Sequence, residues 1–321
     1  MAEFSRSEAK PWAQKQIQDF YVCPISATTS DGTIDEAGLR ENTEMLMEIG
    51  INGLVVGGFV AEAWNLTYAE WLRYHEVVAE TVAGRTDLWT IILDPCAKTA
   101  VEKLDHVEKL GFSGAELINP IIQLRSDGEI FDYFKFVTDR SDLAICLYRT
   151  PVSGKVMGLD LMKRLVDLDT VVCVKQGNMN RAETLMLRRE LRDDFIVSDP
   201  FEYFYLQDLR AGGQVLWAEL SYIIYGKKRH LLKEYASLAR EGKWEQAYPL
   251  WEELRPAWEL YEEEFLNSIA RTGTYASAVG TMKAWSEALG FNAGPMMPPV
   301  RDLEPAHKER LIEQIRATGV V

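Results

Sequence analysis

Eight short apolar runs, alternating with stretches of helical periodicity, constrain the fold of this 321-residue chain more than any other feature. The runs begin roughly 20 to 36 residues apart, a spacing that suits a strand, a turn and a helix. They read YVCPISA, NGLVVGG, LWTIILDP, GAELINP, AICLYRTP, TVVCVKQG, DFIVSDP and GQVLWAEL. Eight such units predict an α/β protein with a closed (β/α)8 TIM barrel. An open doubly wound sheet is the alternative, but ISATTSDG after the first run lacks that fold's glycine-rich phosphate turn.

The same periodicity divides the chain into three parts. Residues 1–18 form a polar N-terminal extension, residues 19–230 hold the eight units, and residues 231–321 show only helical spacing of apolar residues. We therefore expect a barrel followed by a C-terminal helical appendage. The tryptophans of that appendage are interpreted as core, because large aromatic side chains dominate the burial of apolar surface.

Charge and composition exclude several classes of partner. The chain has 35 Lys and Arg against 49 Asp and Glu, a net charge of −14, so it would repel a nucleic-acid backbone or an anionic membrane. No run approaches the roughly 18 apolar residues of a membrane span, and the start MAEFSRSEAKPWAQKQ lacks the apolar core of a secretory signal. We expect a cytoplasmic protein without nucleic-acid or membrane partners.

The four cysteines lie in or beside apolar runs, and none is paired at the close spacing of zinc ligands. We interpret them as small buried hydrophobic residues in a reducing compartment and expect no metal site. They are Cys23, Cys96, Cys146 and Cys173.

Two residues at the predicted active face stand out chemically. The carboxyl ends of the strands form the active face of a β/α barrel, and Tyr148 ends the fifth run while Lys175 ends the sixth. Neighbouring strands lie about 5 Å apart, which brings the phenol close to the amine. Lys175 is either a lysine whose head group reaches water at a strand end or an amine held as a nucleophile. Tyr148 is either a half-buried aromatic or an acid-base group.

Around these residues the chain resembles the dihydrodipicolinate synthase and N-acetylneuraminate lyase family, the class I aldolases that form a Schiff base with a 2-oxo acid. The resemblance extends from about residue 20 to about residue 303. It rests on the segments DGTIDEAGL, GGFVAEAWNLTYAEWLR, YRTPVSG, VKQG, AREGKWEQAYPLW, MKAWSEALGF and MMPPVRDL. Each segment alone is a weak signal, but together they are specific.

The resemblance implies that Lys175 attacks a substrate carbonyl and that Tyr148 shuttles protons to and from the intermediates. Burial at an apolar barrel mouth would favour the neutral, nucleophilic amine. The covalent imine through Lys175 then replaces any cofactor, and the partner is a small-molecule carbonyl substrate. Because the family assembles into dimers and tetramers, we expect a homodimer or a homotetramer.

The chain departs from the family in the turn after the second strand. The family usually has Gly-Thr-Thr-Gly-Glu there, whereas this chain reads GFVAE, with Phe59, Val60 and Ala61 at the altered positions. In the family the two threonines bind the 2-oxo acid carboxylate and relay protons with the active tyrosine. Backbone N–H groups around Val60 and Ala61 are therefore expected to bind the carboxylate here.

Three further departures concern the substrate. Ile121 stands where the family often has a tyrosine, and Ser153 stands where dihydrodipicolinate synthases carry a carboxylate-binding arginine, which disfavours lysine biosynthesis. Trp217 falls near the position of the pyruvyl group. Five apolar side chains predict an apolar or aromatic substrate, although apolar residues at a barrel mouth are also commonly plain packing. They are Phe59, Val60, Ile121, Ile122 and Trp217.

Three functions therefore remain open. The first is a Schiff-base aldolase or lyase that makes or breaks a carbon–carbon bond, with or without a hydration or dehydration step, on a 2-oxo acid such as pyruvate. In the second, Lys175 condenses with an aldehyde or ketone that has no carboxylate. The third is a catalytically inactive barrel that binds a small molecule or regulates another protein. The carbonyl compounds that form a reducible adduct with the protein distinguish the three.

Overall fold

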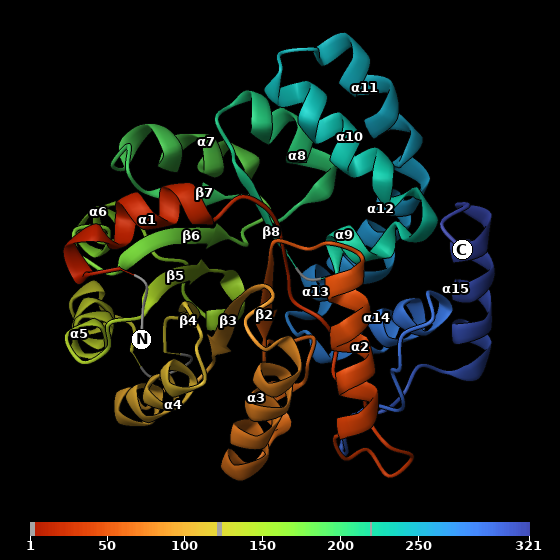
Figure 1. Cartoon of the computed structure of the whole chain (residues 1–321), viewed down its shortest axis with the longest axis horizontal. Helices are drawn as coiled ribbons and strands as arrows, with labels where there is room; N and C mark the ends of the chain where they lie inside the picture. The colour runs from red at the N-terminus through yellow and green to blue at the C-terminus, as the bar shows by residue number, and fades with distance from the viewer. Residues whose placement is uncertain (1–3, 121–123, 219) are drawn as a thin grey trace.

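The computed structural model describes residues 4–120, 124–218 and 220–321, and it confirms the predicted barrel. Eight parallel strands form one sheet in the order β7-β6-β5-β4-β3-β2-β1-β8 (Figure 1). The strands are β1 (Asp19–Val22), β2 (Gly53–Val56), β3 (Asp87–Ile92), β4 (Gly114–Ile118), β5 (Ala144–Arg149), β6 (Val171–Gln176), β7 (Ile196–Ser198) and β8 (Val215–Ala218). Each neighbouring pair in this order is parallel, as the β-α alternation requires.

One serine side chain bridges the seam between the two ends of this sheet. The Ser198 hydroxyl on β7 donates to the carbonyl of Val215 on β8 at 3.2 Å. It also accepts a hydrogen bond from the backbone N–H of Trp217 at 3.2 Å. All three groups are buried, so this hydroxyl satisfies two backbone groups of β8 that face the short strand β7.

Helices follow the strands in the expected alternation and surround them. They are α2 (Glu36–Glu48), α3 (Tyr68–Val82), α4 (Ala97–Lys109), α5 (Asp127–Thr138), α6 (Leu159–Leu165), α7 (Arg181–Glu190), α8 (Glu202–Arg210) and the short α9 (Ser221–Ile224). Local sequence fixes several starts: Thr67 with Glu70 forms a capping box at α3, and Ser126 with Glu129 forms another at α5.

The N-terminal segment packs onto the barrel. After a 3-10 turn (Arg6–Glu8), helix α1 (Ala9–Gln16) buries Ala9 and Ala13. The Lys10 amine donates to the carbonyl of Leu168 at 2.8 Å, just before β6. This extension is therefore part of the packed structure.

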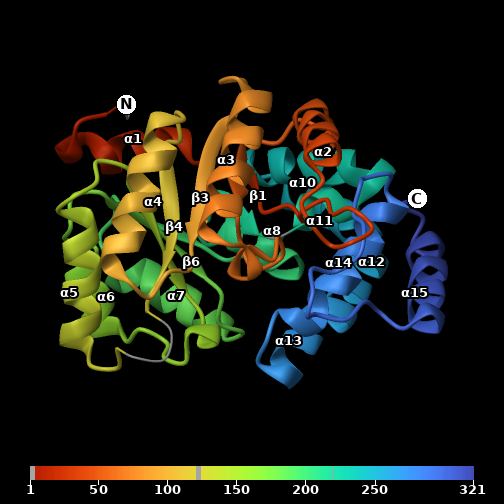
Figure 2. The same ribbon diagram turned by 90° about the horizontal axis from the view of Figure 1, so that it is seen from below.

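The C-terminal helices gather on one side of the barrel, away from α5 and α6, in both Figure 1 and Figure 2. Their core includes Trp285, which is fully buried and donates its indole N–H to the carbonyl of Ile224 at 3.1 Å. The elements are a 3-10 turn (Gly226–Lys228), α10 (Arg229–Arg240), α11 (Trp244–Glu253), α12 (Arg255–Tyr261), a π-helical turn (Glu262–Leu266), α13 (Asn267–Thr272), α14 (Ala276–Ala288) and α15 (Pro305–Ala317).

Aromatic side chains fill the barrel interior. Tyr21 stacks on Trp217 with ring centroids 4.8 Å apart, and Trp89 meets Trp217 edge-on at 4.8 Å. The Asp87 carboxylate accepts from the Tyr21 hydroxyl at 2.6 Å and from the Trp89 indole at 2.9 Å. Burial and this carboxylate raise the pKa of Tyr21, so the phenol stays protonated. The barrel is thus a packed core beneath its active face.

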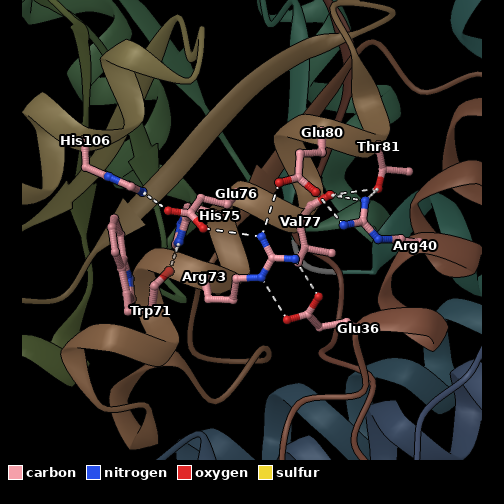
Figure 3. Close-up of polar contacts among 10 residues, drawn as sticks. All are labelled: Glu36, Arg40, Trp71, Arg73, His75, Glu76, Val77, Glu80, Thr81 and His106. Carbon is pink, nitrogen blue, oxygen red and sulfur yellow. Dashed lines mark hydrogen bonds and ion pairs between the residues drawn. The ribbon is translucent and has the colours of Figure 1, made fainter.

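A surface network of ion pairs joins α2 to α3 (Figure 3). Arg73 of α3 contacts Glu36 of α2 at 2.7 Å and Glu80 at 3.2 Å, and Glu80 also pairs with Arg40. Beneath it, burial lowers the pKa of His75 to about 3, and its Nδ1 donates to the Trp71 carbonyl at 2.7 Å. Because the Arg73 pairs are partly exposed, we assign them a modest share of stability.

The cysteine prediction is wrong at one position. Cys23, Cys146 and Cys173 are buried as expected, but Cys96 is exposed. The apolar run that precedes it ends with β3 at Ile92, and Cys96 already caps the start of α4 in solvent. Among the described residues, none of the four cysteines forms a disulfide bond. In the described part of the chain, no helix combines the length and apolar character that crossing a bilayer requires.

We predict that Ser198→Ala lowers the free energy of unfolding by about 1 to 3 kcal/mol, because two buried backbone groups lose their partner. Chemical denaturation measures this loss. Ser286→Ala is the matched control: Ser286 is equally buried, but its hydroxyl has no hydrogen-bond partner among the described residues. Equal stability losses in the two variants would show that the Ser198 bridge contributes nothing.

Candidate active site

Lys175 and Tyr148 lie side by side at the carboxyl ends of β6 and β5. They face each other in the register of the two strands, and the Lys175 Nζ is 4.6 Å from the centroid of the Tyr148 ring. Lys175 is only 1% exposed and Tyr148 only 2%, so neither side chain sits in bulk water. This arrangement places an amine and a phenol at one reaction centre, because the Tyr148 hydroxyl can reach the atoms of a substrate bound to the Lys175 amine.

A buried carboxylate stands beside the amine. Glu116 comes from the middle of β4, is fully buried, and places its Oε1 3.7 Å from the Lys175 Nζ. Its Oε2 accepts the indole N–H of Trp217 at 2.7 Å. Sequence reasoning missed Glu116, although an acid inside the apolar run GAELINP was a visible signal, because buried acids in strands are rare unless paired.

Trp217 acts from inside the barrel instead of from the pocket wall. Its side chain is fully buried between Tyr21 and Trp89. The sequence placed Trp217 beside the substrate, whereas the structure places it in the barrel interior below the cavity. In the structure its effect on the site passes through the hydrogen bond to Glu116 and from Glu116 to Lys175.

A cavity of about 180 Å³ opens above Lys175 and has largely apolar walls. Its walls come from the ends of β5 and β6, from the residues after β7, and from the C-terminal region. The lining residues are Tyr148, Thr150, Pro151, Val152, Lys175, Gly177, Met179, Pro200, Phe201, Leu266, Ile269, Ala270, Gly273 and Tyr275. Lys175 is the only cationic side chain among them, so the cavity suits an uncharged, apolar group next to the reacting carbonyl.

Phe59 is connected to the site by a second tyrosine, Tyr275. Its ring stacks on Tyr275 at 4.6 Å with an angle of 6°, and its centroid is 6.3 Å from that of Tyr148. Tyr275 in turn forms a hydroxyl–hydroxyl hydrogen bond with Tyr148. Sequence reasoning did not find Tyr275, because its contacts join segments 127 residues apart.

Among the other predicted binding residues that the structure describes, Val60, Ala61 and Ser153 do not line the cavity. Val60 and Ala61 are buried, and the Ala61 N–H donates to the Gly58 carbonyl at 3.2 Å within the turn. The hydroxyl of the buried Ser153 bonds to the carbonyls of Thr150 and Lys155, at 2.9 and 2.8 Å. Ile121 and Ile122 lie outside the described residues. The Ala61 N–H, which we expected to bind a carboxylate, is therefore already engaged in its own turn, and the Ser153 hydroxyl is engaged in its own loop.

A buried ion pair holds the turn that carries Phe59. Glu62 accepts the Met297 N–H at 2.9 Å and lies 3.4 Å from the amine of Lys283. Burial raises the pKa of Glu62 and lowers that of Lys283, and their mutual attraction opposes both shifts. Because Lys283 belongs to α14, this pair ties the turn after β2 to the C-terminal helices. No group of three His, Cys, Asp or Glu side chains in the described ranges could hold a metal ion.

Comparison with known proteins matches the profile of the dihydrodipicolinate synthetase family to residues 16–318. The chain belongs to this family. It is 24% identical to the 4-hydroxy-tetrahydrodipicolinate synthase of Methanococcoides burtonii over 303 residues, which cover 92% of this chain and 96% of the relative. The corresponding enzyme of Methanothermobacter thermautotrophicus is 24% identical over 241 residues, covering 74% and 85%.

Solved structures of the family share the fold. A prophage protein of Escherichia coli K12, solved in complex with pyruvate, superposes with a TM-score of 0.82 at 19% identity, covering 95% of this chain and 99% of that one. The 4-hydroxy-tetrahydrodipicolinate synthase of Methylacidiphilum fumariolicum SolV gives a TM-score of 0.81 at 23% identity, covering 94% and 96%.

Family membership confirms the predicted class of protein. Dihydrodipicolinate synthetase family enzymes are lyases and synthases of the class I aldolase type. They work through a covalent Schiff base on a lysine and need no external cofactor. The resemblance inferred from the sequence is therefore correct, and this chain is an enzyme of that type.

We predict that Glu116 and Lys175 are energetically coupled. Glu116→Gln should destabilise the wild-type protein, because it removes a carboxylate that pairs with a buried amine. In the Lys175→Met background the same change should be neutral or stabilising, since it removes a buried charge that has lost this partner. The double-mutant cycle, measured by denaturation, should give a coupling energy on the order of 1 to 3 kcal/mol. Additive effects would contradict a direct interaction.

Proposed function

We propose that Lys175 forms a Schiff base with a small carbonyl compound and that the enzyme makes or breaks a carbon–carbon bond next to that carbonyl. The carbonyl compound is a 2-oxo acid such as pyruvate, or an apolar aldehyde or ketone. The observation that carries the proposal is the buried Lys175 amine, which lies against the Tyr148 ring at the floor of an apolar cavity. Tyr148 is proposed as the acid-base group.

The residues support a balanced reaction sequence. Lys175 gives its ammonium proton to the Glu116 carboxylate beside it, and the neutral amine adds to the carbonyl carbon. The Tyr148 phenol protonates the carbinolamine oxygen, which leaves as water when the imine forms. The resulting Tyr148 phenolate takes a proton from the adjacent carbon, which gives an enamine, and the enamine carbon attacks the partner carbonyl. Tyr148 then protonates the new alkoxide, and water hydrolyses the imine to release the product and the free amine. The cleavage direction reverses these steps.

The cavity walls support an apolar or aromatic partner substrate. Val152, Met179, Phe201, Leu266 and Ile269 face the space beside Lys175. An apolar group gains about 25 cal/mol for each Å² of surface that such walls remove from water. The aldehyde of lysine biosynthesis carries a carboxylate, and Ser153, bound within its own loop, supplies no cation for it.

Two classes of electrophile compete for Lys175. Pyruvate is supported by the family fold and by the pyruvate complex of the related prophage protein. A carbonyl compound without a carboxylate is supported by the engaged Ala61 N–H and by the buried Val60, since the turn after β2 then has fewer free donors for an anion. Both classes use the same amine and the same phenol.

We further propose that the enzyme is a homodimer or homotetramer, as the family resemblance implies, and its cytoplasmic location remains a prediction. Light scattering at micromolar concentration should give a mass of two or four times 36.5 kDa. A mass equal to one chain would contradict this assembly.

The proposal predicts that sodium borohydride reduces the imine and fixes the substrate on Lys175. The carbonyl panel is pyruvate, phenylpyruvate and phenylacetaldehyde, and peptide mass spectrometry locates the added mass. Lys175→Ala should abolish labelling and turnover. Tyr148→Phe should still bind but lose about 10² to 10⁴ in rate, the contribution of one acid-base group.

Lys283 provides an internal control, because it is also a buried lysine but lies in an ion pair with Glu62 outside the cavity. Its peptide should remain unmodified. Labelling by pyruvate supports a 2-oxo acid substrate, and labelling by phenylacetaldehyde alone supports a substrate without a carboxylate. Absence of labelling by all three compounds, or equal labelling of Lys283, would contradict the assigned role of Lys175.

A further inference from the structure

The acid-base tyrosine has a second tyrosine as its hydroxyl partner. The hydroxyls of Tyr148 and Tyr275 are hydrogen-bonded to each other, and both side chains are buried. Tyr148 ends β5 of the barrel, whereas Tyr275 stands directly before α14 in the C-terminal region. Both residues line the cavity that contains Lys175. Two phenols from distant parts of the chain therefore meet at the reaction centre.

Aromatic packing fixes the position of Tyr275. Its ring stacks on Phe59 at 4.6 Å, and Phe265 of the π-helical turn meets it edge-on at 6.0 Å. Gly273, with φ of +70°, ends α13 in the left-handed conformation and lets the chain reverse before Tyr275. A ring held on two sides leaves little freedom to its hydroxyl, so the contact with Tyr148 is part of the packed structure.

Phe59 stands where the resemblance drawn from the sequence places a threonine in the family. Phe59 itself offers no hydroxyl, but its ring supports the residue that does. The residue that lacks a hydroxyl, Phe59, thus stacks directly on the residue that supplies one, Tyr275. The substitution changes the source of the hydroxyl and leaves Tyr148 with a hydrogen-bonding partner.

We propose that Tyr275 is a positioning residue that relays protons to Tyr148, an inference that rests on the proposed Schiff-base function. When Tyr148 gives its proton to the carbinolamine oxygen, the Tyr275 hydroxyl donates to the resulting phenolate, so that the two phenols share one proton. The proton lost by the carbon next to the imine returns to this pair, and Tyr275 exchanges it with water, so each phenol ends the cycle as it began. A second small cavity, lined by Phe59, Trp64, Val152, Gly273, Thr274, Tyr275 and Ala276, adjoins Tyr275 and offers water a route to it.

A purely structural role is the alternative, in which the hydroxyl pair only fastens the C-terminal region to the barrel. The two roles make different predictions for Tyr275→Phe, which keeps the ring between Phe59 and Phe265 and removes only the hydroxyl. If the hydrogen bond only holds the C-terminal region to the barrel, its loss changes the stability of the protein or the binding of substrate. If Tyr275 relays protons, its loss slows proton transfer while the imine still forms.

The test follows the exchange of carbon-bound hydrogen in deuterium oxide, because enamine formation removes a proton from the carbon next to the imine. Pyruvate is the probe, and phenylacetaldehyde replaces it if pyruvate does not label Lys175. Proton NMR measures the exchange rate of wild type and Tyr275→Phe across pH, and borohydride trapping at equilibrium measures imine formation in the same samples. Thermal unfolding reports whether each variant remains folded.

We expect Tyr275→Phe to exchange about 10- to 100-fold more slowly, with a changed pH profile, while trapping and the concentration of probe at half-maximal rate stay at the wild-type values. Tyr225→Phe is the matched control, because Tyr225 is also buried and its hydroxyl donates to Glu202 at 2.9 Å outside the cavity. It should exchange at the wild-type rate, even if it is less stable.

The outcomes separate this inference from the proposed function. Wild-type protein that traps no probe on Lys175 would overturn both. Normal trapping with the same exchange rate and pH profile in Tyr275→Phe as in wild type would overturn the relay alone. Equal slowing in Tyr225→Phe would also overturn it, because the effect would then follow from the loss of any buried hydroxyl.

Discussion

The burial of one amine at the end of β6 is the constraint on which the rest of the site depends. An amine removed from water needs either neutralisation or a partner charge, and Lys175 has Glu116 at 3.7 Å. The interior of the barrel holds that carboxylate in turn, because Trp217 donates to it and is itself fixed between Tyr21 and Trp89. The aromatic core of the barrel thus determines where the reactive nitrogen stands.

The C-terminal region completes the site that the barrel begins. Leu266, Ile269 and Tyr275 form one side of the cavity, and the Glu62–Lys283 pair joins this region to the turn after β2. A barrel without these helices would keep Lys175 and Tyr148 but would leave them open to water. Exclusion of water strengthens every electrostatic interaction in the site, so the appendage is part of the chemistry proposed here.

The sequence predicted the features that depend on local pattern. Alternating apolar runs located the eight strands, and the ends of two runs located Tyr148 and Lys175, because strand ends in a barrel converge on one face. Features that depend on distant segments were not predicted. Glu116 was passed over inside an apolar run, and nothing near Tyr275 in sequence indicates its contact with Tyr148.

The direction of side chains was the other reason why the structure differs from the site predicted from the sequence. Trp217 belongs to a strand, where successive side chains alternate between faces, so a position near the mouth does not decide between the pocket and the barrel interior. Val60 lies in the turn after β2, where hydrogen bonds to the Gly58 carbonyl fold the chain back and leave the Val60 side chain buried in the core. Packing within the barrel decided both cases.

A crystal structure of the borohydride-reduced adduct tests the central claim most directly. The account predicts continuous electron density from the Lys175 Nζ into the bound carbon skeleton. That skeleton should pass Tyr148 and extend toward Leu266 and Ile269 inside the cavity. Density attached to a different lysine, or a skeleton that leaves the cavity without contacting Tyr148, would contradict the account.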